Sequence, residues 1–97
     1  MPEMRFRIRW PDGSSESCYS PSLVVKDHLV VGETYALGDF LERCRVALHC
    51  ASERVEARYG RPCAFALAQL AALETRAASL PAAAGTVFVE AFEEGKE

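Results

Sequence analysis

The chain has 97 residues, of which 49% are hydrophobic and 26% charged, so it fits one domain and is not a disordered tail. Its formal net charge of −3 argues against a dedicated nucleic-acid-binding protein, which usually carries a basic excess. No apolar run approaches the roughly 20 residues of a membrane span, and the first ten residues lack the apolar stretch of a signal peptide. We therefore expect one cytoplasmic domain over residues 1–97, with no membrane or nucleic acid partner and with reduced cysteines.

The N-terminal segment alternates between apolar residues and arginines over residues 4–10, which is the period of a half-buried strand. Residues 11–14, with the sequence PDGS, are typical of a turn, because proline presets its dihedral angle and glycine tolerates a positive φ. Residues 15–19 can return as a second strand. The sequence therefore predicts a β-hairpin over residues 1–20.

Residues 21–37 are predicted to form a short helix followed by a loop. Ser20 before Pro21 is a helix-start pattern, with serine as the N-cap and proline at the first helical position. The β-branched Val24 and Val25 oppose a helix over residues 22–29, so both a helix and a turn are considered there.

A pair of helices is predicted over residues 38–80. Asp39 and Glu42 match a capping box at the start of the first helix, Gly60 matches its C-cap, and Pro62 opens the second helix. Apolar residues then recur at steps of three and four. In the first helix this stripe comprises Leu37, Leu41, Cys44, Leu48, Ala51, Val55 and Tyr59. In the second helix it comprises Phe65, Ala66, Leu70, Leu73, Ala77 and Leu80.

A final strand is predicted over residues 85–93, followed by a frayed tail over residues 94–97. The order of the elements indicates an α+β fold, in which a three-stranded sheet is covered on one face by the two helices. The last strand is expected to pair with the first, since the hairpin occupies the first strand's other edge. Its direction is left open.

The outer face of this sheet is the first candidate for function. Strict alternation places Arg5, Arg7 and Arg9 there, together with residues of the last strand. These are Phe88, Glu90 and Phe92. One interpretation is a solvated face that stabilises itself through arginine–glutamate pairs and stacking on the rings. The other is a homodimer contact, since monomers usually avoid such apolar patches.

Anion binding is the second candidate. At about 100° per residue, a second stripe lies beside the core stripe of the first helix. It comprises Arg43, Ala47, Cys50, Arg54 and Arg58. Its guanidinium groups can bind a carboxylate or phosphate, or can form ordinary ion pairs with nearby acids. Ser20, Ser22 and Lys26 offer a second place for an anion, at the start of the short helix.

The spacing of the cysteines and histidines gives little support for a catalytic or metal site. The four cysteines are separated by 26, 6 and 13 residues and the two histidines by 21, and neither spacing is a recognised metal pattern. His49 points about 100° away from Cys50 around the helix, so it cannot activate that thiol. Cys18 can meet His28 only through folding. We therefore expect no cofactor, no metal and no catalytic residue.

Three segments resemble one protein family: MPEMRFRIRWPDGS, ESCYSPSLVVKD and ASERVEARYG. The chain is similar, over residues 1 to about 92, to small bacterial proteins of the nitrogen-starvation response. These are typically encoded in a cluster with a nitrilase, a radical SAM protein, an acetyltransferase and a flavoprotein. The resemblance implies a role in nitrogen metabolism and partners encoded in that cluster. It brings no catalytic residues with it.

Three functions are therefore considered. The first is a non-catalytic accessory protein that binds a cluster enzyme or a small nitrogenous ligand. The second is an anion-responsive regulator that uses the arginine stripe or the helix start at Ser20. The third is a small enzyme that uses Cys18 or Cys50 with a histidine, which requires a thiol and an imidazole within about 4 Å of each other.

Overall fold

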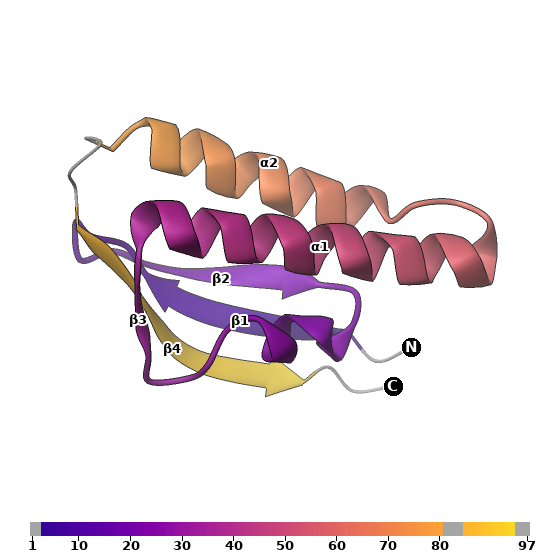
Figure 1. Cartoon of the computed structure of the whole chain (residues 1–97), viewed down its shortest axis with the longest axis horizontal. Coiled ribbons are helices and arrows are strands. Elements are labelled where there is room, and N and C mark those ends of the chain that lie inside the picture. The colour runs from indigo at the N-terminus through magenta and orange to yellow at the C-terminus, as the bar shows by residue number, and fades with distance from the viewer. Residues whose placement is uncertain (1–2, 81–84, 95–97) are drawn as a thin grey trace.

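The fold is described from a computed structural model, which covers residues 3–80 and 85–94. The strands are β1 (Met4–Arg9), β2 (Ser15–Ser20), β3 (Thr34–Ala36) and β4 (Thr86–Glu94). The helices are the 3₁₀ helix η1 (Leu23–Asp27) and the α-helices α1 (Leu37–Tyr59) and α2 (Ala64–Ala78). Figure 1 shows both α-helices on one side of the sheet, which confirms the α+β class. Apart from Glu94, which ends β4, the predicted frayed tail lies outside the described residues.

The sheet has four antiparallel strands in the order β2-β1-β4-β3, so the prediction of three strands was wrong. The missing strand, β3, has only three residues, too few for alternation to be recognised in the sequence. It pairs with the edge of β4 that β1 leaves open. Thr34 pairs with Phe88 and Ala36 with Thr86 there.

A β-bulge interrupts the ladder between β1 and β4. Arg7 lies opposite Ala91 but Ile8 lies opposite Val89, so Glu90 is the extra residue. The bulge reverses the alternation beyond it. Phe92 therefore lies opposite Phe6 and packs against the core, and its predicted place on the outer face was wrong.

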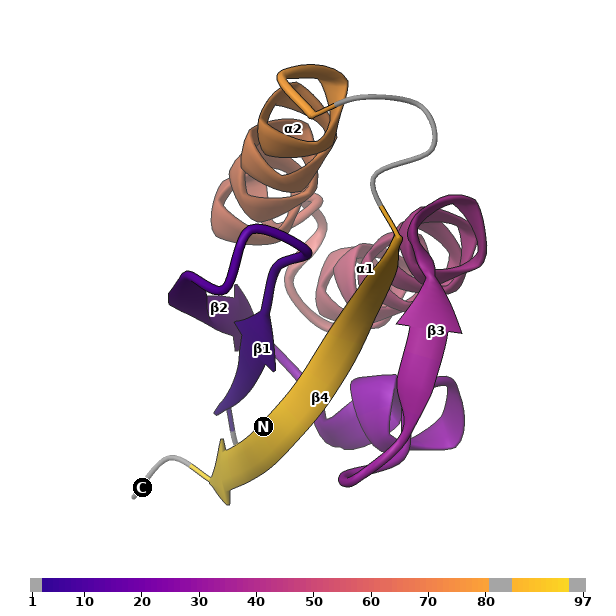
Figure 2. The same cartoon turned by 90° about the vertical axis from the view of Figure 1, so that its left-hand side faces the viewer.

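The core lies between the helices and the inner sheet face. Figure 2 shows α2 beside β2 and α1 toward β4 and β3. Trp10 and Phe40 meet edge to face, with ring centroids 6.0 Å apart. The described part of the chain contains no helix that is both long enough and apolar enough to cross a bilayer.

The buried stripe of α2 begins one residue later than predicted. It comprises Ala66, Leu70, Leu73 and Ala77, at steps of four, three and four. Phe65, which was predicted to share this stripe, is 75% exposed instead. Phe65 points about 100° away from Ala66 around the helix, and α2 lies on the sheet with Ala66 facing the core, so Phe65 faces solvent.

Ser52 forms a hydrogen bond that links α1 to the start of α2. This serine is unfavourable by propensity in the middle of α1, yet it is buried. Its Oγ accepts a hydrogen bond of 3.1 Å from the backbone N–H of Cys63, the N-cap residue of α2. The side chain thus satisfies a backbone donor at the end of a neighbouring helix.

We expect Ser52→Ala to lower the free energy of unfolding by about 1–2 kcal/mol, because it leaves the N–H of Cys63 without its acceptor. Urea unfolding followed by circular dichroism measures the change. The matched control is Ser15→Ala, at an exposed position of β2, which should change stability by less than about 0.5 kcal/mol. Equal values for the two variants would contradict this role of Ser52.

Candidate functional site

The arginines of the outer sheet face differ in their partners. Arg9 donates a hydrogen bond of 2.7 Å to Glu90 and lies 6.0 Å from the centroid of the Phe88 ring. Arg7 lies 3.5 Å from the carboxylate of Glu93. These contacts agree with the interpretation of a face that stabilises itself. A homodimer through this face stays a prediction.

The serines at the start of η1 are occupied by their own turn. Ser20 and Ser22 are both buried. The hydroxyl of Ser20 donates to the carbonyl of Ser22 at 2.7 Å, and the hydroxyl of Ser22 accepts from the N–H of Val24 at 3.1 Å. Ser22 rather than Ser20 is therefore the cap, and neither hydroxyl faces solvent. Lys26 lies in the last turn of η1 and is exposed.

The predicted arginine stripe of α1 does not converge on one site. Ala47, in its middle, is fully buried. Arg43 binds the carboxylate of Asp39 and the carbonyl of His28, each at 3.0 Å. Arg54 lies eleven residues after Arg43, about 16 Å further along the helix axis, and Arg58 lies one turn beyond Arg54. A single small anion cannot contact all three guanidinium groups.

The buried thiols are poor nucleophiles. Burial raises the pKa of the Cys44 thiol to about 12. Burial also raises the pKa of Cys18, with smaller contributions from the charges of Glu16 and Cys44. Both therefore stay protonated at neutral pH, whereas a nucleophilic cysteine needs a thiolate. Within residues 3–80 and 85–94, no group of three or more metal-ligating side chains comes together.

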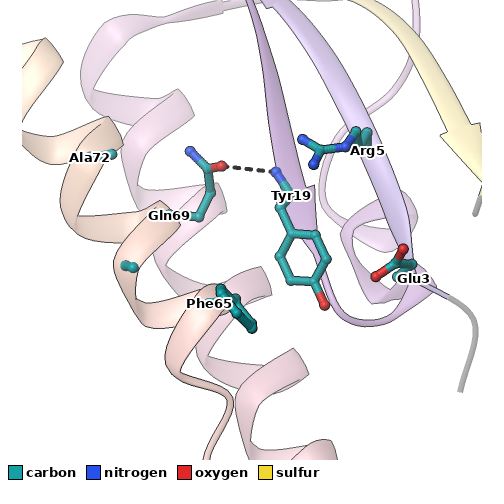
Figure 3. A pocket seen from close by; sticks show the side chains of 7 residues that line it. Glu3, Arg5, Tyr19, Phe65, Gln69 and Ala72 are labelled. Atoms are coloured by element: carbon teal, nitrogen blue, oxygen red, sulfur yellow. Dashed lines mark hydrogen bonds between the residues drawn. The ribbon is translucent and has the colours of Figure 1, made fainter.

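A groove of about 500 Å³ lies between β2 and α2, bordered by the start of β1 (Figure 3). We call it the β2–α2 groove. It is lined by Glu3, Arg5, Tyr19, Phe65, Ala68, Gln69 and Ala72. Of these, only Arg5 was among the site residues predicted from sequence. The others join from separate elements, so no local motif marked them.

Aromatic rings form part of the groove wall, and two small alanine side chains line the part formed by α2. The rings of Tyr19 and Phe65 lie edge to face, with centroids 6.2 Å apart. Ala68 and Ala72 leave space beside them, because their side chains end at Cβ. Partial burial is the largest cause that raises the pKa of the Tyr19 phenol, and the nearby Cys63 and Glu3 raise it further, so this side chain stays neutral. The apolar part of the groove therefore fits a side chain or ring.

Gln69 closes part of the sheet edge inside the groove. β2 is an edge strand, and the backbone N–H of Tyr19 points away from β1. It donates a hydrogen bond of 2.9 Å to Oε1 of Gln69. Figure 3 shows this bond between α2 and the strand. Such a cover protects an edge from pairing with another strand, so the groove is suited to side chains rather than to an added strand.

Arg5 supplies a positive charge beside the rings. It lies opposite Tyr19 in the β1–β2 ladder and is exposed. Glu93 lies opposite Arg5 in the β1–β4 ladder, and no ion pair of Arg5 is found among the side chains of residues 3–80 and 85–93. Glu3 borders the groove two residues earlier on the chain. The groove therefore combines an apolar interior with charged groups at its border.

Together, the fold and the groove define a two-layer α+β protein in which a pair of helices covers one face of a four-stranded antiparallel sheet. Residues 5–92 match the model of the family described as nitrogen starvation-induced protein NitG. The chain belongs to this family, which confirms the resemblance to nitrogen-starvation proteins. No curated protein and no solved structure matches the chain.

Proposed function

We propose that this member of the nitrogen starvation-induced family is a non-catalytic accessory protein that binds a partner protein through the β2–α2 groove. The observation that carries the proposal is the exposure of Phe65, at 75%, on the wall of the groove. A large aromatic side chain held in contact with solvent loses unfavourable hydration when a partner covers it. Aromatic anchors in preformed grooves supply much of the binding energy of protein interfaces.

The partner is expected among proteins of the same nitrogen pathway. The resemblance noted in the sequence implies genes clustered with a nitrilase, and an accessory protein acts on the enzymes produced with it. Two observations favour this function over an enzyme that uses Cys18 and over a single anion site on the arginines of α1. The thiols of Cys18 and Cys44 are buried, and Arg43 is separated from Arg54 and Arg58.

A capture experiment with matched variants tests the proposal. The tagged full-length protein, Phe65→Ala and Leu67→Ala are each used to isolate partners from nitrogen-starved cells of the native host. Leu67 is 38% exposed on the same helix but does not line the groove, so it controls for general loss of apolar surface. We expect Phe65→Ala to recover at least about tenfold less of the partner, since losing an anchor typically weakens binding by this much or more.

The expected pattern is a protein that the wild type and Leu67→Ala retain and Phe65→Ala loses. A partner bound equally by all three forms would show that another surface makes the contact. Both variants change exposed residues, so circular dichroism should show that each remains folded.

A further inference from the structure

The charge of Arg5 beside the aromatic wall indicates what the groove recognises. We infer that it binds the C-terminal residue of the partner chain, with an apolar, preferably aromatic side chain in the groove and the terminal carboxylate on Arg5. This inference rests on the proposed function, because it names the part of the partner that docks. It differs from a general apolar contact in requiring a negative charge next to the ring.

The arginines of β1 provide the first argument. They share one strand and one face, but their neighbours differ. Arg9 is paired with Glu90 and Arg7 with Glu93. Arg5 is the one that borders the groove. Glu93 lies opposite it in the β1–β4 ladder but pairs with Arg7, and no ion pair of Arg5 is found among the side chains of residues 3–80 and 85–93. A guanidinium left without a carboxylate can take one from a partner in a two-pronged geometry.

The shape of the occupant follows from the neighbouring walls. Arg5 lies opposite Tyr19 across the β1–β2 ladder, and Tyr19 touches Phe65. Arg5 and the two rings therefore border the same groove. A C-terminal residue carries a side chain and a carboxylate on the same Cα, so it can contact the rings and Arg5 together. An internal phenylalanine fills the apolar part but brings no charge to Arg5.

Glu3 gives the bound residue a direction. Its carboxylate borders the same groove two positions before Arg5, on the side of the Tyr19 hydroxyl (Figure 3). A ligand carboxylate placed at that end meets a like charge, whereas one placed at Arg5 meets an opposite charge. The same repulsion disfavours acidic side chains in the residues that approach Glu3. Charge complementarity thus selects one orientation of the occupant.

The test uses the peptide Gly-Ser-Gly-Ser-Phe with a free C-terminal carboxylate, and the same peptide with a C-terminal amide. Each is titrated into the ¹⁵N-labelled full-length protein, with the backbone amide of Tyr19 and the side-chain amide of Gln69 as reporters in the groove. We expect the free acid to bind about tenfold more tightly than the amide, because only the acid offers a charge-assisted hydrogen bond to Arg5. Shifts confined to residues outside the groove would overturn the inference.

Two arginine variants complete the design. Arg5→Gln should reduce the affinity for the acid to that of the amide and leave the affinity for the amide unchanged. Arg7→Gln is the matched control on the same strand, and it should leave both affinities unchanged. Equal binding of acid and amide to the wild type would overturn the inference. It would leave the proposed function standing if Phe65→Ala still loses the partner in the capture experiment.

A third ligand tests whether the groove recognises the C-terminus of a partner chain or a free carboxylic acid. N-acetylphenylalanine presents the same ring and carboxylate without the preceding residues. We expect it to bind more weakly than the peptide acid, because the groove of about 500 Å³ also accommodates part of the peptide backbone. Equal affinity of the two would overturn the assignment to a chain terminus.

Discussion

Replacing Phe40 by alanine is expected to lower the free energy of unfolding by about 3–5 kcal/mol. This side chain of α1 is fully buried and meets the ring of Trp10 edge to face across the layer between helix and sheet. Its removal leaves a cavity that the strands and helices around it cannot fill completely. Since small domains are stable by only about 5–15 kcal/mol, this loss removes a large part of the stability of the protein.

Urea unfolding followed by the fluorescence of Trp10, the single tryptophan of the chain, measures the loss. Phe65→Ala is the matched control, because it makes the same chemical change at a position that is 75% exposed. It should alter stability by less than about 0.5 kcal/mol. A loss below about 1 kcal/mol for Phe40→Ala would show that α1 does not pack on the sheet as described.

The protein is also expected to lose stability as the pH rises from about 9 to about 12. Burial raises the pKa of Cys44 from 9.0 to about 12 and raises that of Cys18 in the same direction. In this range the unfolded chain releases the thiol protons while the folded protein keeps them. The unfolded state thus binds fewer protons, so the free energy of unfolding falls with pH by up to about 1.4 kcal/mol per pH unit for each thiol.

The contribution of these thiols is fully present below pH 9 and disappears as the pH approaches the raised pKa values. Urea unfolding at a series of pH values, with a reductant present, measures the slope. The double variant Cys18→Ala, Cys44→Ala is the comparison, since it retains every tyrosine and lysine that also titrates at high pH. Equal slopes for the wild type and the double variant between pH 9 and 11 would contradict the prediction.

Much of the fold is readable from local patterns. The alternation of β1, with its apolar residues on one side, places Phe6 and Ile8 in the core. The spacing of apolar residues in α1 and the glycine after Tyr59 mark the long helix, and Gly60 has the positive φ, 82°, of a left-handed cap. Such patterns depend on residues a few positions apart, whose geometry the element itself sets. The exact helix starts were predicted wrongly: Asp39 does not cap α1, which begins at Leu37 without a side-chain cap, and α2 begins at Ala64 rather than at Pro62.

Three features were not predicted from the sequence, because each depends on residues that are distant in the chain. The strand β3 exists only because the free edge of β4 accepts it. The bulge at Glu90 is a property of the pairing between β1 and β4, and strict alternation therefore placed Phe92 on the wrong face. The exposure of Phe65 follows from how α2 lies on the sheet, since the stripe that starts at Ala66 already supplies its buried side.

The candidate site shows the same division. The sequence by itself determined that three arginines share one face of β1, because side chains two residues apart on a strand point the same way. Only the tertiary structure decided which of them has a partner and that Arg5 borders a groove with Tyr19 and Phe65. The physical reason is that periodicity assigns a side chain to a face, whereas the packing of distant elements decides what that face meets.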